Sequence, residues 1–563
     1  MNKTIALYLL NNLLDRVEFG PNGKLKNNNL TQMEIDALRF VLNSEVGIDD
    51  DPTPTGDDET GGDDETDGDD ETGGDCGTGG NDGTSDEDKP DVASILNLDS
   101  LKPENEFDEQ NSKVTLCMDF GTAMSKAFAM RDGLPVELAL GARAGSATGG
   151  YLVDSSLFIT NEGLIFFGPQ AVKKSMHAEV ENRARADSLK ARLSMGSMAN
   201  ISEIRVDKRV NPTQIPFTEG DLITLYLSYL TDLVSSELES QNCSRYTVRR
   251  FARPCWDEER NAWAEPQMKK MLAISQILAD TFHGRWQDGL SVDVAKKALI
   301  DVNKTVRIPE YLIARSIEEP VAAAAALVVD PDEAQREIVI VVDVGAGTTD
   351  FGVFLLQNNP NKEVLKTRLI DKTVTYLPQA GNRVDDLLKF FVLKEGNIDH
   401  QAEEGNQALQ SLSGVIRTYK ETLFREGIVE IGVNGINILV DKEEFINSRG
   451  VGEFTRLLKD KFVAVLSSLG GGYIDFLAKY GLNVVLTGGG AEMPMLSSLA
   501  AGVIEVNGKK IMRKASPMVP EWIEEKYPQF ASQYLQLAVS IGGAARVLPD
   551  AAKAPVDFPP TGQ

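Results

Sequence analysis

Two stretches of the chain follow the same pattern of apolar and polar positions. Residues 114–120 read VTLCMDF, an apolar run that ends in an Asp-Phe-Gly turn and is followed by a second apolar run, KAFAM. Residues 338–344 read IVIVVDV, lead into a Gly-rich turn and are followed by FGVFLL. Short apolar runs bounded by glycine turns predict β-strands. Because the two strand–turn–strand units lie 224 residues apart, counted from Asp119 to Asp343, they indicate a duplicated domain.

Amphipathic patterns between the strands predict helices over 219–240, 256–282, 383–395 and 453–480. Alternation of strands with helices of this length is typical of an α/β fold, in which helices cover the faces of a sheet. We therefore expect an α/β body that begins near Lys113. A chain of 563 residues is long enough to bury the cores of two large lobes.

The first 48 residues predict a small helical hairpin. Segments 3–17 and 31–42 are amphipathic, and Thr31 with Glu34 fits a capping box at the start of the second helix. A hairpin of this size buries little surface by itself. It is therefore expected either to dock on the rest of the protein or to recognise a partner, and the sequence leaves both interpretations open.

Residues 49–112 are predicted to form a disordered linker. A hexad repeat that begins GDDETG runs from Gly56 to Ser85 and offers no apolar core. Repulsion between its acids keeps such a segment extended. The acids lack the ligand order and the bidentate glutamate of a calcium loop. Residues 549–563, PDAAKAPVDFPPTGQ, predict a disordered tail.

Most of the net charge belongs to that linker. The sequence has 57 Lys and Arg against 85 Asp and Glu, a formal charge of −28. Residues 49–91 contain 19 acids and one base, Lys89, and so carry 18 of the 28 net charges. A chain without a net basic surface is unlike a protein that coats nucleic acid. The basic run Arg245–Arg253 alternates as a strand does, so no nucleic-acid partner is expected.

Several other classes are excluded by composition. No stretch approaches the roughly 18 apolar residues of a membrane span, and the N-terminus lacks the features of a signal peptide. The four cysteines show no C-x-x-C spacing, and the three histidines lie far apart. We therefore expect no disulfide framework, no zinc site, no membrane partner and a cytoplasmic location.

The glycine turns after the two strands have the chemistry of phosphate sites. In residues 119–125, Gly121 permits a tight turn that exposes backbone N–H groups, and the hydroxyls of Thr122 and Ser125 add donors. The aspartate at the strand end is placed to hold Mg²⁺ through water beside phosphate oxygens. Residues 343–350 supply the same parts again, so the two turns predict a clamp for the phosphates of a nucleotide.

Two further segments fit a nucleotide-binding protein with two lobes. The glycines at 488–490 follow an apolar strand and precede Pro494, which lets the backbone approach a base or ribose closely. Residues 316–326, SIEEPVAAAAA, predict a turn into a helix of small residues. Such a helix can cross a neighbouring helix closely, as a hinge between lobes requires.

These motifs carry a resemblance to a known family. DFGTAMS, EEPVAAAAA, DVGAGTTD and LTGGGAEMP, in this order, resemble the two phosphate motifs, the first connecting motif and the adenosine motif of the actin-like ATPase superfamily. The chain is most similar to the nucleotide-binding domain of DnaK-type heat-shock chaperones. The resemblance covers residues 113–548 and includes AVSIGGAARVL at 538–548, which is similar to the second connecting helix.

The resemblance implies a two-lobed actin-like ATPase fold of duplicated ribonuclease-H-like domains with inserted subdomains. Lobe I would span 113–335, lobe II would span 336–530, and residues 531–548 would form a helix that returns to lobe I. ATP or ADP with Mg²⁺ would lie in the cleft. The implied metal ligands are Asp119 and Asp343.

Residue roles are implied by motif position. The residues implied in catalysis are Asp119, Lys190, Glu319 and Asp343. Lys190 would neutralise phosphate charge, although it could instead lie with Arg192 on a solvated helix face. The residues implied in nucleotide binding are Gly121, Thr122, Ala123, Ser125, Gly345, Ala346, Gly347, Thr348, Thr349, Lys420, Gly488, Gly489 and Gly490.

The sequence also departs from the family pattern. Glu421 and Phe424 replace a basic and a hydroxyl residue near Lys420, and Glu492 stands where the chaperones carry arginine. A carboxylate cannot provide the cationic stacking that arginine gives an adenine ring, so altered base affinity or specificity is expected. Met124 replaces a polar residue in the first turn.

The function implied is a slowly hydrolysing ATPase that acts as a conformational switch for a protein partner, such as a co-chaperone or client adaptor. The chaperones' peptide-binding domain is not expected here, because few residues follow 548. Three alternatives stay open: an actin-like filament protein, a small-molecule kinase of the same superfamily, and a chain in which ATP is bound without hydrolysis.

Overall fold

The computed structural model describes residues 95–106, 113–327 apart from 148, 177–182, 195, 197 and 199, and then 335–359 and 364–549. The chain divides into two compact units, Met1–Lys89 and Pro90–Gln563, and all described residues belong to the second. The predicted N-terminal hairpin, the hexad repeat and residues 550–563 of the predicted tail lie outside the described residues.

The predicted linker is too long at its C-terminal end. Residues 95–106 contain η1 (Asp99–Leu101) and α3 (Pro103–Glu106). The Asn97 N–H donates to Thr281 Oγ1 at 2.9 Å, and the Tyr311 hydroxyl donates to the buried Ser100 carbonyl at 2.9 Å. Leu96 and Leu101 pack against the first core. The apolar side chains of this segment therefore bind it to the body, whose boundary lies at Pro90 rather than 113.

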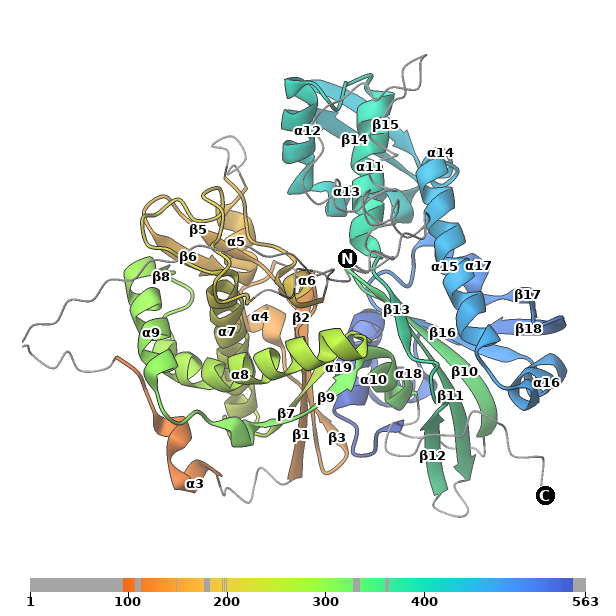
Figure 1. Cartoon of the computed structure of the whole chain (residues 1–563), viewed down its shortest axis with the longest axis horizontal. Helices are drawn as coiled ribbons and strands as arrows, with labels where there is room; N and C mark the ends of the chain where they lie inside the picture. The colour runs from red at the N-terminus through yellow and green to blue at the C-terminus, as the bar shows by residue number, and fades with distance from the viewer. Residues whose placement is uncertain are drawn as a thin grey trace, which may run out of the picture. The chain divides into compact units, whose positions relative to one another are not determined.

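The first sheet has the strand order β3-β2-β1-β7-β9. Strand β1 pairs antiparallel with β2 and parallel with β7, β2 pairs antiparallel with β3, and β7 pairs parallel with β9. Figure 1 shows the resulting mixed sheet. Its strands, with β4 paired to β2, are β1 (Val114–Asp119), β2 (Met124–Arg131), β3 (Leu134–Val136), β4 (Val153–Asp154), β7 (Arg249–Arg253) and β9 (Ile313–Glu318).

The second sheet repeats this arrangement in the order β12-β11-β10-β16-β18-β17. Strand β10 pairs antiparallel with β11 and parallel with β16, β11 pairs antiparallel with β12, and β16 pairs parallel with β18. The α/β class predicted from the sequence is confirmed. The strands, with β13 paired to β11, are β10 (Gln335–Val344), β11 (Thr349–Asn359), β12 (Val364–Leu369), β13 (Thr375–Leu377), β16 (Leu482–Thr487), β17 (Gly502–Val506) and β18 (Lys509–Ala515).

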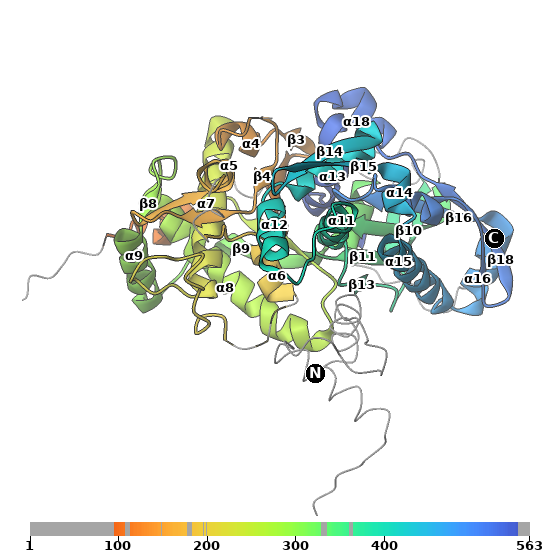
Figure 2. The same ribbon diagram turned by 90° about the horizontal axis from the view of Figure 1, so that it is seen from above.

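Helices cover the sheets and form two inserted regions (Figures 1 and 2). The capping box formed by Thr218 and Asp221 starts α7. Elements of the first half are α4 (Leu140–Arg143), β5 (Leu157–Ile159), β6 (Leu164–Phe167), α5 (Gly168–Lys174), α6 (Leu189–Ser194), α7 (Glu219–Ser240), α8 (Glu258–Phe282), β8 (Leu290–Ser291), α9 (Val292–Lys304) and η4 (Glu310–Leu312).

The second half carries the other helices and a separate two-stranded sheet, β14–β15. The predicted helix 453–480 is in fact two helices, because residues 468–470 are not helical and Gly470 is the N-cap of the second helix. The elements are α11 (Gly381–Glu395), α12 (Glu403–Ser413), α13 (Ile416–Glu426), β14 (Ile428–Val433), β15 (Ile436–Asp441), α14 (Lys442–Ile446), α15 (Arg449–Ser467), α16 (Gly471–Tyr480), η6 (Pro494–Leu496), α17 (Ser497–Ala500), α18 (Glu521–Lys526) and η7 (Pro528–Gln533).

Two helices lie between the sheets, and the first of them consists mostly of alanine. Helix α10 (Glu319–Ala326) follows the last strand of the first sheet and packs on β10 and β11 of the second. Helix α19 (Tyr534–Gly543) comes after the second sheet and packs on β1 and β2 of the first. The two helices also pack on each other. Their side chains belong to a core cluster that contains residues of both sheets.

The segment before α19 also links the two halves. The ring of Phe530 lies 5.2 Å from that of Phe128 in β2 and 5.1 Å from that of Tyr151. The Gln533 Oε1 atom accepts the Tyr151 N–H at 3.1 Å, and the Trp522 indole donates to the Ala326 carbonyl at 3.2 Å. Residues that follow the second sheet are thus fixed to the first sheet and to α10.

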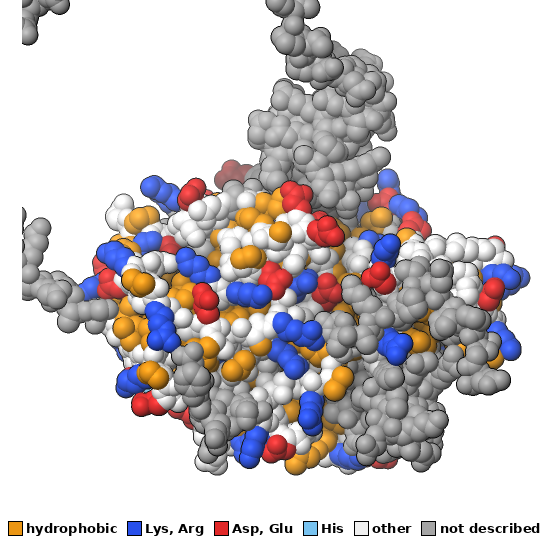
Figure 3. Space-filling view, turned by 60° about the horizontal axis from the view of Figure 1, so that its bottom comes forward, with side chains coloured by type: hydrophobic (Ala, Val, Ile, Leu, Met, Phe, Trp, Pro, Cys, Tyr) orange, Lys and Arg blue, Asp and Glu red, His pale blue; other side chains and the backbone are white. Residues whose placement is uncertain are grey.

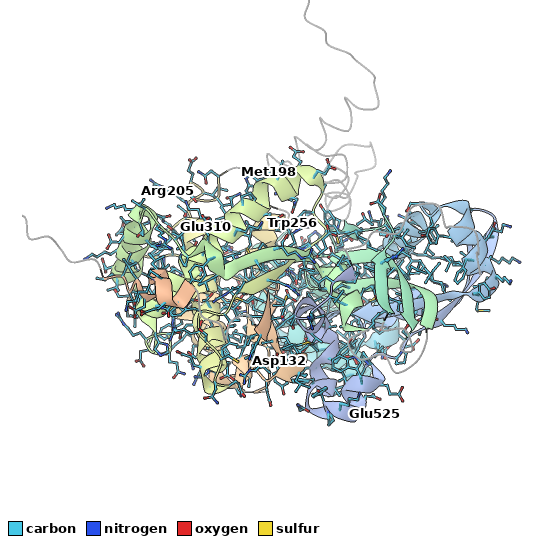
Figure 4. All side chains as sticks on the ribbon, turned by 90° about the horizontal axis from the view of Figure 1, so that it is seen from below. Asp132, Met198, Arg205, Trp256, Glu310 and Glu525 are labelled. Carbon is cyan, nitrogen blue, oxygen red and sulfur yellow. The ribbon has the colours of Figure 1, made fainter. Side chains whose placement is uncertain are left out.

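The surface of the described body carries charges of both signs. On the face drawn in Figure 3, acidic, basic and apolar side chains are interspersed. The exposed acids that Figure 4 labels are Asp132 at the β2–β3 turn, Glu310 in η4 and Glu525 on α18. Within the described ranges, no single helix has both the length and the apolar composition of a membrane span, whereas the pair α15 and α16, bent by 115°, meets those two criteria jointly.

The α10–α19 contact gives a stability prediction. A Cβ atom at Gly542 would lie 1.7 Å from the Ala322 carbonyl oxygen, so Gly542→Ala must push the helices apart. We expect a loss of about 1–3 kcal/mol in the free energy of unfolding, measured by urea denaturation. Gly452→Ala in α15 is the control, because a Cβ there meets no atom within 4 Å. It should stabilise by about 0.5–1 kcal/mol. Equal effects of both changes would contradict the proposed contact.

Candidate functional site

A cavity of about 600 Å³ lies where the two glycine turns, α6, α10, α11, α13 and the 488–490 turn come together. It contains residues from both sheets, although the two halves of the site are more than 200 residues apart in sequence. The predicted site residues that line it are Asp119, Gly121, Thr122, Ala123, Lys190, Glu319, Asp343, Gly345, Ala346, Gly347, Thr348, Lys420, Gly488, Gly489 and Gly490.

Two predicted binding residues do not line the cavity. Ser125 is buried, and its hydroxyl is hydrogen-bonded to that of Ser155 at 2.8 Å. Thr349 is also buried and donates to the Gln379 carbonyl at 2.8 Å. Successive side chains of a strand point to opposite faces, so Ser125 faces away when its neighbour Lys126 faces the cavity. The hydroxyl groups of Ser125 and Thr349 therefore stabilise the two turns through hydrogen bonds outside the cavity.

The first turn places a lysine beside its aspartate. Asp119 and Lys126 are opposite each other across β1 and β2, and Lys126 Nζ lies 2.7 Å from Asp119 Oδ2. Lys190 Nζ lies 3.7 Å from Asp119 Oδ1. Burial acts to raise the pKa of Asp119, but the two ammonium groups outweigh it and hold the pKa below its ordinary value. Asp119 is therefore a carboxylate with a cation at each oxygen.

The second turn places an acid at the corresponding position. Asp343 and Asp350 are opposite each other across β10 and β11, as Asp119 and Lys126 are in the first hairpin. Burial, followed by the Glu319 and Asp350 carboxylates, raises the pKa of Asp343 well above its ordinary value. Asp350 Oδ1 accepts the Cys255 N–H at 2.7 Å. The second hairpin thus places two carboxyl groups opposite each other, with no ammonium group at the position that Lys126 holds in the first.

Lys190 links the first turn to the interhelical contact. It forms a buried ion pair with Glu319, the first residue of α10. Burial acts to lower the pKa of Lys190, but the Glu319 and Asp119 carboxylates raise it above its ordinary value. The lysine is therefore charged and buried inside the cavity wall. The alternative of a solvated helix face applies instead to Arg192, whose side chain is 58% exposed.

The third turn folds over the end of β10. Gly488 has a φ of +85°, and a Cβ there would lie 2.4 Å from Asp343 Oδ1. The Gly490 N–H donates to the Val344 carbonyl at 2.8 Å. Only glycine fits this approach, because a side chain at 488 would collide with the aspartate. The turn at 488–490 therefore lines the cavity close to the second hairpin.

The end of the cavity beyond the turns is lined by α11, α13 and α19. Lys420 Nζ lies 2.8 Å from Asp385 Oδ1 and donates to the Gly381 carbonyl at 3.2 Å. Its charge is therefore paired within the protein. Arg417 and Glu421 pair at 3.0 Å one turn apart on α13. The other residues of this end are Asn382, Phe424, Arg425, Glu492, Met493, Gln536 and Val539.

Several lining residues were not predicted from the sequence, among them Lys126, Asp385 and Arg417. Lys126 could have been found, because pairing the two strands across the turn places it opposite Asp119. Arg417 lies three residues before Lys420, on the same face of a helix. Asp385 carries no local signal, since only the packing of α11 on α13 brings it to Lys420.

The site fits a magnesium ion at one turn better than at the other. In the described part of the chain, no group of three or more His, Cys, Asp or Glu side chains is arranged to hold a metal. Mg²⁺ in phosphate sites needs only one or two carboxylates, with waters and phosphate oxygens. Asp119 has both oxygens beside lysines, whereas Asp343 forms no ion pair with any described residue. Of the two predicted ligands, Asp343 is the better suited.

Comparison of the chain with protein-family models and with curated proteins found no match.

The buried acid of the second hairpin gives a pH prediction. Burial and the Glu319 carboxylate raise the pKa of Asp350 to about 7, from 3.8 for a free aspartate. The folded protein then binds this proton more tightly than the unfolded chain, so the stability that Asp350 contributes is lost as the pH rises from 3.8 towards 7. Relative to wild type, Asp350→Asn should gain up to about 1.4 kcal/mol per pH unit over that window.

Urea denaturation in metal-free buffer at a series of pH values measures this difference. The control is Asp288→Asn, the same change at an exposed aspartate outside the two sheets. A difference between Asp350→Asn and wild type that does not change with pH would contradict the assigned burial of that carboxyl.

The Lys420–Asp385 pair gives a second prediction for the site. Their side chains are 9% and 13% exposed, so Lys420→Met leaves a largely buried carboxylate without its cation. We expect a loss of about 3 kcal/mol in the free energy of unfolding. The double variant Lys420→Met/Asp385→Leu should lose less than Lys420→Met alone. Additive losses in this double-mutant cycle would show that the two groups do not interact.

Proposed function

We propose that the chain is an actin-like ATPase, related to the nucleotide-binding domain of DnaK-type chaperones, that binds Mg·ATP in this cavity and hydrolyses it slowly. One observation carries the proposal: two glycine turns at equivalent positions of two equivalent sheets line a single cavity. A clamp of this kind offers backbone donors from both sides to a chain of phosphates.

The fold supports the family assignment. The strand order and strand directions of β3-β2-β1-β7-β9 are the same as those of β12-β11-β10-β16-β18. This repeat is what duplicated ribonuclease-H-like domains require. In this proposal α10 and α19 would be the two connecting helices between the lobes, which agrees with the packing of each on the sheet to which it is not directly joined. The two-lobed actin-like architecture is therefore part of the proposal.

In the proposed function, the basic and the acidic residues of the cavity have different roles. Lys126 and Lys190 supply cations at the first turn, where they would contact phosphate oxygens. Asp343 would hold Mg²⁺ through water, and Glu319 would orient the attacking water from the start of α10. Bound Mg²⁺ would neutralise charge that develops on the phosphates. Such a site accelerates hydrolysis mainly by positioning and electrostatic stabilisation.

The end of the cavity near α13 would receive the base. The acids Glu421 and Glu492 line it, and neither can stack on adenine as a cation does. Arg417 and Arg425 line the same end, so cationic groups are supplied from other positions of α13. Phe424 and Met493 add apolar surface for a planar ring. ATP remains the proposed nucleotide, held by a base site of altered composition.

The proposed role is a conformational switch for a protein partner. The nucleotide would contact turns of both sheets, and α10 joins that site to the contact between the halves. A ligand that binds the open and closed arrangements with different affinity shifts their populations, and a partner can read the change.

The proposed location is the cytoplasm. The described cysteines, Cys117, Cys243 and Cys255, are free, which supports a reducing cytoplasmic location.

Calorimetric binding of Mg·ATP and release of phosphate test this proposal. Wild type should bind ATP and release phosphate, and Asp343→Asn should slow phosphate release by about 100-fold, because it removes the charge nearest the proposed metal. Asp288→Asn, outside the cavity, should behave as wild type. No binding of ATP, or equal release rates in wild type and Asp343→Asn, would refute the proposal. Binding without hydrolysis would leave only the ATP-binding alternative.

A further inference from the structure

Two β-hairpins outside the cavity each expose apolar side chains on one face. On β14–β15, Ile428 and Leu439 are 46% and 64% exposed. Leu439 lies opposite Glu430, and Ile428 lies opposite Asp441, so these four side chains share one face. On β17–β18, Val503 and Met512 lie directly opposite each other and are 55% and 51% exposed. Neither face is covered by another described element.

The two faces carry opposite charge. The first face carries the acids Glu430 and Asp441, whereas the second carries Lys510 and Lys514, with one acid, Glu505, opposite Lys510. We call the first the acidic hairpin face (Ile428, Glu430, Leu439 and Asp441) and the second the basic hairpin face (Val503, Glu505, Lys510, Met512 and Lys514). Within the described residues, Glu430, Lys510 and Lys514 form no ion pair.

Residues beside the basic hairpin face add an aromatic ring and a further basic group. A Cβ at Gly481 would lie 3.0 Å from the Met512 carbonyl, so the preceding Tyr480, 59% exposed, lies beside this hairpin. The Lys479 ammonium lies 4.9 Å from the centre of the Tyr480 ring. An apolar surface with an aromatic ring and several basic groups is thus presented together, as in the energetically important part of many protein interfaces.

We propose that the acidic hairpin face of one chain binds the basic hairpin face of a second copy. Leu439 and Ile428 would bury their side chains against Met512 and Val503, with Glu430 beside the lysines of the partner copy. Figures 1 and 2 show the two hairpins at separate places on the body, with α15 between them. One molecule therefore keeps one face free after using the other.

The symmetry of such an assembly follows from this geometry. The contact is heterologous, because it joins different surfaces of identical chains, so it generates a ring or an open filament rather than a closed dimer. Opposite rim charges favour the head-to-tail pairing and disfavour pairing of like faces. The inference does not depend on the proposed function, since neither face contributes a residue to the cavity.

Sedimentation velocity of the full chain, with one variant for each face, tests this inference. Leu439→Asp blocks the acidic hairpin face, and Met512→Asp blocks the basic hairpin face. Each replaces an exposed side chain, so the fold should be kept, which circular dichroism can verify. Wild type should form species larger than dimers that grow with concentration. Each variant alone should associate at least about tenfold more weakly, because a carboxylate buried against apolar surface is costly.

The mixture of the two variants is the decisive sample. Each variant keeps the face that the other lacks, so an equimolar mixture should form dimers and nothing larger. Val306→Asp is the control, because Val306 is a fully exposed apolar residue outside both faces. It should assemble as wild type does. A wild type that stays monomeric at all concentrations, a mixture that stays monomeric, or either variant assembling as wild type does would overturn the inference.

Discussion

The close contact between α10 and α19 is the constraint on which the described structure depends. Gly542 lets α19 approach the backbone of Ala322, where any side chain would collide. Each helix comes after the strands of one sheet and packs on the other, so their separation sets the separation of the sheets. At that separation the two glycine turns, one from each sheet, line the same cavity. Residue size in a helix contact thus controls a site that these residues do not touch.

The electrostatics of the cavity follow from a single difference between its two halves. Equivalent register positions hold Lys126 in the first hairpin and Asp350 in the second. The two lysines of the first turn therefore lower the pKa of Asp119, whereas burial and the neighbouring carboxyl groups of the second turn raise the pKa of Asp343. In the proposed function, this difference assigns phosphate contacts to the lysines and Mg²⁺ to the second turn. Two sheets of the same strand order thus contribute unlike charges to one cavity.

The sequence was sufficient for features that depend on local patterns. Apolar runs and glycine turns predicted the two hairpins, and helical periodicity predicted α7 with its observed bounds. Features that depend on packing were missed. The hydroxyls of Ser125 and Thr349 form hydrogen bonds outside the cavity, and no local sequence pattern reveals these partners. The linker prediction ran too far because residues 95–101 find their apolar partners only in the folded body. Asp385 reaches Lys420 only through the packing of two helices.

Hydrogen–deuterium exchange of the full chain with and without Mg·ATP tests the central claim most directly, because it reports on both sheets in one experiment. The account predicts that backbone amides of 119–126, 343–350 and 488–490 become protected together when the nucleotide binds. These segments line one cavity but belong to different sheets. Protection of only one of the two hairpin turns, or of neither, would contradict a phosphate clamp built from both.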